Sequence, residues 1–261
     1  SAHSTGERAS PALREENTNI KLGLYEKSRL TASWRLSTDL KKTSDEYGLI
    51  IMNLLSHAGV GKKDITGAIM SSVVPGINYT LTHMLEFYLD QRPLLVGPGI
   101  KTGLNIKLDN PRELGGDLIT DAVSAFKRYG GDLIVIDFGT MSAVTARGEF
   151  LGGCILPGVR VAVDALTERA AKLPKIDLEL PKTVIGRNTV SCMQSGLLYG
   201  YVGQLEYLIN SFKREMNAPE AKVVATGGMS GVIANMTKCI DITDRLLTLE
   251  GLNILYNLNA G

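Results

Sequence analysis

The sequence predicts a duplicated α/β fold in which two similar halves enclose a ligand cleft. In each half a polar pair that ends in a threonine leads directly into a β-hairpin, at Thr18 in the first half and at Thr140 in the second. Each half then continues into helices and further strands, and a glycine-rich strand end occurs at residues 223–228. Two glycine turns that face one cleft would hold the two ends of a phosphate chain.

The composition limits the class of protein. A chain of 261 residues with 44% apolar residues forms one large domain or two of ordinary size. No stretch approaches the ~20 consecutive apolar residues that cross a membrane. A formal net charge of +1 lacks the basic excess of a nucleic-acid-binding surface. We therefore expect a protein with neither a membrane nor a nucleic acid as its partner.

The cysteines and histidines do not form a recognisable site. The three cysteines lie far apart, and no histidine or second cysteine stands at a spacing that binds zinc. This pattern excludes a disulfide framework and fits the reducing cytoplasm. The three histidines are isolated, which argues against a histidine-based catalytic triad.

The first folded half is expected to cover residues 17–115. Residues 1–16 are polar and small and show no apolar periodicity, so we expect an added or substituted leader that lies outside the fold. Apolar residues alternate over 20–25 and again over 30–36, which predicts a hairpin. The other segments are predicted as helices at 43–58 and 77–89 and as strands at 65–74, 93–96 and 104–108.

The second half, residues 116–261, contains the stretch around which the chain is organised. Residues 118–129 have the apolar spacing of a helix, and Gly130 ends it. The short apolar run 133–136 is typical of a buried strand, and a hairpin with its return strand at 150–155 follows. The last helix is expected to pack back on the first half.

The buried strand ends in Asp137-Phe138-Gly139-Thr140. A glycine lets backbone N–H groups approach a phosphate, a hydroxyl donates a hydrogen bond, and an acid holds a cation. These residue types at a strand end predict a phosphate site. An Asp137 that only caps a turn would give the same local pattern.

Two further places carry candidate chemistry. Asp117 follows two glycines and opens a helix, some twenty residues before Asp137, although a helix-capping aspartate would look the same. Thr226-Gly227-Gly228 follows an apolar run, and its glycines allow a base or ribose to lie against the backbone. A plain strand-to-helix turn remains the alternative there.

Taken together and in order, the motifs of this chain resemble those of type III pantothenate kinase. The resemblance extends from Asn17 to about Leu258 and places the chain in the acetate-kinase/sugar-kinase/Hsp70/actin superfamily, so it implies a duplicated ribonuclease-H-like, or actin-like ATPase, fold. The motifs that carry it are Asn17-Thr18-Asn19, residues 71–75, residues 97–103, Asn110-Pro111, Gly115-Gly116-Asp117, residues 137–140, Gly152-Gly153, Pro157-Gly158, residues 185–189, residues 194–196 and Thr226-Gly227-Gly228.

The resemblance implies transfer of the γ-phosphoryl group of ATP to the primary hydroxyl of pantothenate, which gives 4′-phosphopantothenate in the first step of coenzyme A biosynthesis. Asp117 matches the general base, and Asp137 matches the acid that holds a monovalent cation, K⁺ or NH₄⁺. ATP would bring Mg²⁺. A homodimer is implied, since Thr189 matches a substrate contact that often reaches its site in a dimer. The implied ATP contacts are Asn17, Thr18, Asn19, Gly139, Thr140, Gly227 and Gly228, and the implied pantothenate-site residues are Leu108, Gly115, Gly116, Leu118 and Thr189.

The chain departs from the pattern of that family at several places. The family carries Asp-x-Gly just before the Asn-Thr pair, where the acid helps to place Mg²⁺ and the glycine meets phosphate, and here Arg14 and Glu16 stand there. Leu118 replaces an arginine that follows the base, and Leu108 replaces an aromatic residue of the substrate pocket. The alternative is therefore a catalytically weakened relative that binds nucleotide or a pantothenate-like ligand in a regulatory role.

Overall fold

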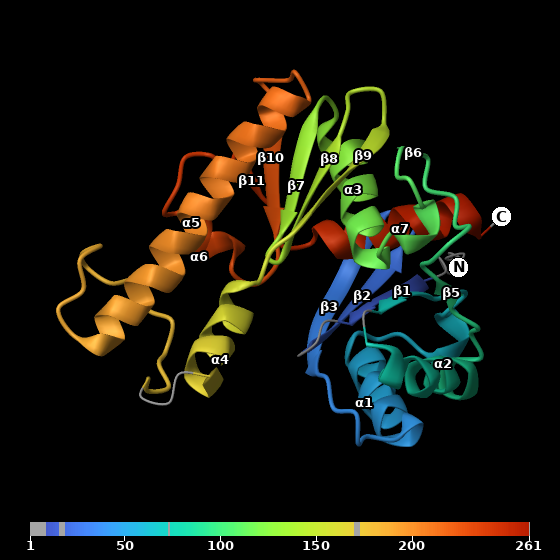
Figure 1. Ribbon diagram of the computed structural model, residues 1–261. Helices are drawn as coiled ribbons and strands as arrows, with labels where there is room; N and C mark the ends of the chain where they lie inside the picture. Colours follow the sequence, from blue (N-terminus) through green and yellow to red (C-terminus); the bar gives the residue numbers. More distant parts are fainter. Residues whose placement is uncertain (1–8, 16–18, 73, 170–172, 261) are drawn as a thin grey trace. The chain divides into compact units, whose positions relative to one another are not determined.

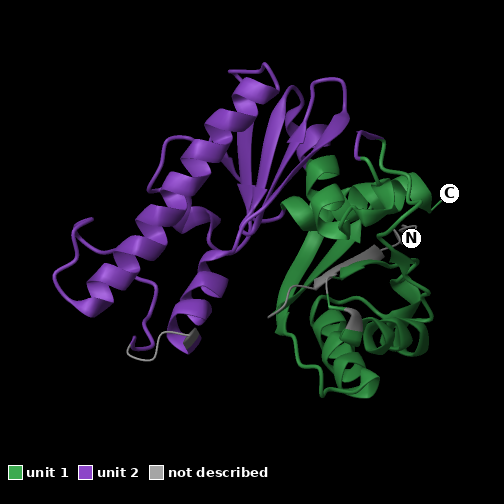
Figure 2. Cartoon of the chain, in the orientation of Figure 1, with its two compact units in different colours: residues 1–103, 109–124, 247–261 green, residues 104–108, 125–246 purple. Residues whose placement is uncertain are grey.

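The computed structural model describes residues 9–15, 19–72, 74–169 and 173–260 (Figure 1). The chain divides into two compact units, and each unit contains its own β-sheet (Figure 2). Unit 1 comprises residues 1–103, 109–124 and 247–261, and unit 2 comprises residues 104–108 and 125–246.

The sheet of unit 1 has five strands in the order β3-β2-β1-β4-β5. The strands β1, β2 and β3 are antiparallel neighbours, whereas β1 and β4, and then β4 and β5, run parallel. The strands are β1 (Ala9–Glu15), β2 (Asn19–Glu26), β3 (Arg29–Ser37), β4 (Ile69–Ser72) and β5 (Leu94–Leu95).

Strand β1 corrects the expectation of a leader over residues 1–16. Residues 9–15 form the middle strand of the sheet, in which Arg14 pairs with Lys21 of β2 on one side and with Ser71 of β4 on the other. The sequence hid this strand because Pro11 cannot donate a ladder hydrogen bond and because charged residues at its end are unusual in a central strand. The strand is stabilised by its pairing with β2 and β4, and not by the β-propensity of its own residues.

Helices α1 and α2 cover one face of the unit 1 sheet (Figure 1). Thr43 and Glu46 cap the start of α1 reciprocally, each side chain bonding the backbone N–H of the other residue. Alternate residues of β2 (Ile20, Leu22 and Leu24) are fully buried against the two helices, as the hairpin pattern predicts. The helical segments here are α1 (Ser44–His57), η1 (Lys62–Asp64), α2 (Pro75–Leu89) and η2 (Pro111–Glu113).

The last helix of the chain, α7 (Leu247–Asn259), belongs to unit 1. A Cβ atom at Gly251 would lie 2.2 Å from the carbonyl oxygen of Thr120, so this glycine lets α7 approach the first half of helix α3 (Gly116–Tyr129) closely. The Thr248 hydroxyl donates to the buried Asp121 carboxylate between the same two helices. The expected boundary at residues 115 and 116 differs from the structure, because the first nine residues of α3 (116–124) lie in unit 1.

The sheet of unit 2 has the order β11-β10-β7-β8-β9-β6. Its strands are β6 (Asn105–Ile106), β7 (Leu133–Asp137), β8 (Thr140–Val144), β9 (Glu149–Ile155), β10 (Lys222–Thr226) and β11 (Ile242–Thr243). Besides the end of α3, its helices are α4 (Val159–Arg169), α5 (Thr189–Glu215) and α6 (Ser230–Ala234). The buried side of α5 packs on β7, β8 and β10 to form the core of this unit.

The two sheets repeat one topology. In each, an antiparallel meander of three strands is followed by two parallel strands on the far side of the first strand, so that β9-β8-β7-β10-β11 repeats β3-β2-β1-β4-β5. This is the duplicated ribonuclease-H-like fold of actin-like ATPases, and the predicted fold class is confirmed. No helix in the described part of the chain is long and apolar enough to cross a membrane.

Candidate active site

Asp117 lies in the first turn of α3, where the ends of strands β4 and β5 approach the helix. The Ser71 hydroxyl, at the end of β4, donates a 2.9 Å hydrogen bond to Asp117 Oδ1. Ser71 is almost fully buried, so its hydroxyl has a fixed direction. An acid in the first turn of a helix is also stabilised by the helix dipole. One oxygen of the carboxylate is thus held by a buried hydroxyl of the neighbouring strand.

Gly116 makes this close approach possible. A Cβ atom at residue 116 would lie 2.9 Å from Ser71 Oγ and 3.2 Å from the carbonyl oxygen of Val96. The preceding Gly115 has open space around its Cβ position. The two glycines of the motif therefore have different roles, and only Gly116 is required by packing within unit 1.

Lys21 is a residue that the sequence analysis missed. It is buried, with 7% of its surface exposed, although lysines are almost never buried without a polar or charged partner. In the register of the sheet, residue 21 of β2, residue 14 of β1 and residue 71 of β4 are aligned. A lysine in an alternating strand is typical of the solvent face, and only the packing of α7 on that face reveals its burial.

Asp137 ends strand β7, and the turn that follows it is fixed by backbone contacts. The Thr140 hydroxyl donates to the Asp137 carbonyl oxygen at 3.3 Å, and the Leu156 N–H donates to the Gly139 carbonyl oxygen at 2.8 Å. Gly139 has a φ of +128°, a conformation that favours glycine. The Thr140 hydroxyl is thus tied to the backbone of Asp137, and Gly139 provides the left-handed residue of the turn between them.

The glycine turn after β10 lies directly beside this carboxylate. Strands β10 and β7 pair in parallel, with Thr226 opposite Asp137. Gly227 has a φ of +90°, and a Cβ atom there would lie 2.6 Å from Asp137 Oδ1. Gly228 has open space around its Cβ position, and the Ser230 hydroxyl closes the turn by donating to the Gly227 carbonyl oxygen at 2.7 Å. The structure therefore joins two motifs that lie ninety residues apart in the sequence.

Tyr201 of α5 lies beneath the Asp137 turn and was not identified from the sequence. Its ring centroid is 5.9 Å from that of Phe138. Burial raises the pKa of Tyr201 to about 12. The negative charge of Asp137 also raises this pKa, whereas a hydrogen bond with the backbone of Gly139 lowers it. The phenol is therefore neutral near pH 7 and supports the turn as a packed, uncharged group. Burial also raises the pKa of the Cys154 thiol nearby.

The remaining predicted residues are distributed over both units. Asn17 and Thr18 lie outside the described residues, and Asn19 begins β2 and is half-buried. In unit 1, Leu118 is a half-buried residue of α3. In unit 2, Leu108 packs against Gly152, whose Cβ position is 3.3 Å from Leu108 Cδ2. Thr189 is exposed and is the first residue of α5, which Asn188 caps.

The Asp137 carboxylate can hold a hard cation, because carboxylate oxygens are the ligands that such ions take. Thr226 lies opposite Asp137 in the sheet, and the Thr140 hydroxyl contacts the Asp137 carbonyl oxygen. Mg²⁺ bound with ATP uses one or two carboxylates together with phosphate oxygens. The place where the resemblance puts such a carboxylate holds Arg14, so residue 14 does not fit that role. Within the described residues, no three His, Cys, Asp or Glu side chains gather as a metal site.

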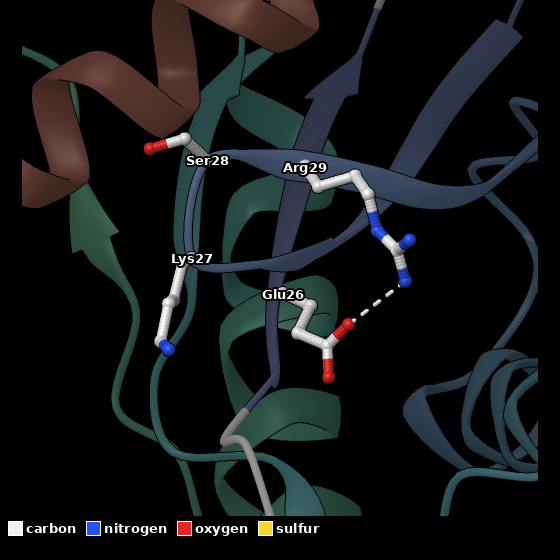
Figure 3. A pocket seen from close by; sticks show the side chains of 4 residues that line it. All are labelled: Glu26, Lys27, Ser28 and Arg29. Atoms are coloured by element: carbon white, nitrogen blue, oxygen red, sulfur yellow. Dashed lines mark hydrogen bonds and ion pairs between the residues drawn. The ribbon is translucent and has the colours of Figure 1, made fainter.

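Two surface hollows of unit 1 lie apart from the Ser71–Asp117 contact. One is at the tip of the β2–β3 hairpin, where the Arg29 guanidinium and the Glu26 carboxylate point toward each other at 3.1 Å (Figure 3). Its lining consists of the four turn residues alone. The other is lined by residues 66–68, residues 91–94, Tyr256 and Ala260. Neither lining includes a predicted site residue.

Comparison with known proteins decides the family. The model of the family described as type III pantothenate kinase matches residues 16–211. The chain belongs to this family. Type III pantothenate kinases are phosphotransferases, and the match covers Asp117, Asp137 and Thr189 but ends before the Thr226 turn.

The chain is also similar to solved structures, one of them with a TM-score above 0.5. A Campylobacter jejuni protein described as a Baf family transcriptional activator matches at 16% identity and a TM-score of 0.58, over 95% of this chain and 97% of that one. Component A of (R)-2-hydroxyglutaryl-CoA dehydratase from Acidaminococcus fermentans matches at 15% identity over 95% and 97% of the two chains, with a TM-score of 0.48. The ROK hexokinase of Thermus thermophilus matches at 14% identity over 95% and 98%, with a TM-score of 0.47.

The packing of Gly116 predicts a matched pair of substitutions. Gly116→Ala should lower the free energy of unfolding by about 1–3 kcal/mol, because the added methyl group overlaps Ser71 Oγ and the Val96 carbonyl. Gly115→Ala should change it by less than about 0.5 kcal/mol, since that position is open and outside the left-handed region. Urea unfolding followed by circular dichroism measures both. Equal effects of the two substitutions would contradict the described packing of α3 on β4.

Proposed function

We propose that the protein transfers the γ-phosphoryl group of ATP to the primary hydroxyl of pantothenate, forming 4′-phosphopantothenate and ADP in the first step of coenzyme A biosynthesis. The observation that carries the proposal is the Ser71–Asp117 hydrogen bond in a member of the type III pantothenate kinase family. A buried hydroxyl holds one oxygen of a carboxylate at a helix start, as a general base requires.

In the proposed reaction, Asp117 accepts the proton of the primary hydroxyl while that oxygen forms a bond to the γ-phosphorus. The bond from the γ-phosphorus to the oxygen of the β-phosphate breaks, and ADP leaves with that electron pair. The protein contributes position and charge, because phosphoryl transfer needs little covalent chemistry from the enzyme. Ser71 acts by orienting Asp117, and Leu108, Gly115, Gly116, Leu118 and Thr189 are proposed to line the pantothenate site.

The ATP phosphates are proposed to bind the turn of residues 137–140 together with Gly227, Gly228 and the Asn17-Thr18-Asn19 segment. Backbone N–H groups at such turns suit phosphate oxygens. Lys21, buried two residues beyond Asn19, adds a positive charge at the position aligned with residues 14 and 71. Asp137 is proposed to hold K⁺ or NH₄⁺, which supplies positive charge beside the transferred group. Mg²⁺ is proposed to enter with ATP.

The sequence at the end of β1 favours a second function. An arginine at residue 14 and a glutamate at residue 16 replace the acid and the glycine that the family pattern uses for Mg²⁺ and phosphate. A protein changed in this way would bind nucleotide or a pantothenate-like ligand without turnover, in a regulatory role. Turnover and binding therefore have to be measured separately.

The experiment is a coupled ADP-release assay with ATP, Mg²⁺ and pantothenate, with and without K⁺. We expect pantothenate-dependent turnover that K⁺ increases and that Asp117→Asn lowers by about 10²–10⁴-fold, because the proton loses its acceptor. Asp109→Asn, which changes an exposed carboxylate of the same unit, should retain the wild-type rate.

Two results would contradict the proposal. One is wild-type protein that binds nucleotide in a calorimetric titration but releases no pantothenate-dependent ADP in any salt, which would favour the regulatory function. The other is an Asp117→Asn variant with the wild-type rate.

The proposal includes a homodimer in the cytoplasm. Apolar side chains shortly before Thr189 in the sequence are exposed, with Ile185 81% and Val184 61% accessible. Large exposed apolar side chains are favourable at a subunit interface, where association removes them from water. The three cysteines are free thiols, which fits a reducing compartment.

Sedimentation velocity tests the dimer. We expect the wild-type protein to sediment as a dimer at micromolar concentration and Ile185→Asp to shift it toward the monomer, because a buried charge is costly at an interface. Tyr79→Asp, at an exposed aromatic residue of α2, is the control and should leave the dimer intact. A wild-type monomer at all concentrations would overturn this part of the proposal.

A further inference from the structure

Thr226, like Ser142, carries a buried hydroxyl in unit 2 without a hydrogen-bond partner among the described residues. Thr226 is fully buried, and among the described residues its Oγ1 has no hydrogen-bond partner. A buried polar atom without a partner costs free energy, and native proteins retain such atoms where a ligand or water completes them. We therefore expect a ligand or a water molecule to complete the hydrogen bonding of Thr226, the last residue of β10.

The register of the sheet places Asp137 beside this hydroxyl. Thr226 and Asp137 are paired residues of the parallel strands β10 and β7, so their side chains leave the same face. The Asp137 carboxylate inclines toward β10, because its Oδ1 lies 2.6 Å from the Cβ position of Gly227, the residue after Thr226. A carboxylate oxygen and a buried hydroxyl oxygen thus lie on neighbouring strand ends.

The charge of Asp137 decides which kind of ligand would complete this pair. An anion on its own would be repelled by the carboxylate, and a single carboxylate supplies less negative charge than proteins usually use to hold a dedicated divalent cation. A hydrated alkali cation exchanges its water for carboxylate, hydroxyl and carbonyl oxygens at little cost. Resting on the proposed cation at Asp137, we propose that Thr226 Oγ1 is a further ligand of that monovalent cation.

As a cation ligand, the Thr226 hydroxyl would have opposite effects on the stability of the protein in a salt that supplies the cation and in one that does not. Without the cation, Thr226 is a buried polar group with no partner among the described residues, and replacing it with valine removes a cost. With the cation bound, the same replacement removes a ligand. A hydroxyl with a purely structural role would instead stabilise the protein equally in both salts.

The test measures the melting temperature by circular dichroism, without nucleotide, in KCl and in N-methyl-D-glucamine chloride at equal ionic strength. The wild-type melting temperature should rise with K⁺ and saturate. Thr226→Val should raise the apparent Kd for K⁺ about tenfold or more, as expected for a lost contact to a charged group. In N-methyl-D-glucamine chloride it should be at least as stable as wild type.

Two controls define the contact. Thr226→Ser keeps the oxygen and should bind K⁺ within about threefold of wild type. Ser142→Ala removes another buried hydroxyl that has no partner among the described residues. Ser142 lies on β8 opposite Val135 of β7, and its replacement should leave the K⁺ titration unchanged. If Thr226→Val fails to fold, Thr226→Ala compared with Thr226→Ser gives the same contrast.

The outcomes separate this inference from the kinase proposal. A Thr226→Val titration equal to that of wild type, with Asp137→Asn abolishing the K⁺ effect, would overturn the role of Thr226 and leave the Asp137 site standing. No K⁺ effect on wild type would overturn the inference as well. A K⁺ effect that Thr226→Val weakens would support it even if the protein turned over no pantothenate.

Discussion

Each half of this protein depends on one parallel strand pairing. In unit 1 strand β1 pairs with β4, and in unit 2 strand β7 pairs with β10. In unit 2, the pairing of β7 with β10 sets Asp137 opposite Thr226 and brings the Gly227 turn against the carboxylate. In unit 1, the pairing of β1 with β4 sets Ser71 at the same edge, where its hydroxyl holds Asp117. In open α/β sheets ligands bind beyond the carboxyl ends of the strands, and both groups of residues lie there.

The sequence was most informative where local pattern and tertiary structure agree. The run 133–136 and the turn 137–140 could be predicted because a short β-branched segment that ends in an acid and a glycine has few other conformations. The strands over 20–25 and 30–36 were predicted from their alternation and correspond to β2 and β3.

What could not be predicted depends on contacts between distant segments. Strand β1 was missed because Pro11 and two charged residues disguise a strand that only its neighbours stabilise. Lys21 is buried because a helix from the far end of the chain covers it. The hydroxyl of Thr226 gains significance only from register, since nothing local distinguishes it from any threonine before a glycine turn.

The two halves share a topology but not their chemistry. Unit 2 has an acid at the end of its central strand, whereas unit 1 has Arg14 at the corresponding place, with Lys21 and Ser71 as its neighbours in the sheet. A duplicated fold can diverge in this way because the sheet requires only backbone pairing at these positions. In the proposed function, the cation and the base are assigned to different copies of the same motif, Asp137 in one and Asp117 beside the other.

We propose that the strand-end residues of unit 2 bind the phosphates of ATP and a monovalent cation together. The most direct measurement is a crystal structure with a non-hydrolysable ATP analogue, Mg²⁺ and Tl⁺, whose anomalous scattering locates the K⁺ substitute. The account predicts a Tl⁺ peak in contact with Asp137 and Thr226, and phosphate oxygens on Gly139 and Thr140. A nucleotide whose phosphates lie away from residues 137–140, with no Tl⁺ at Asp137, would contradict it.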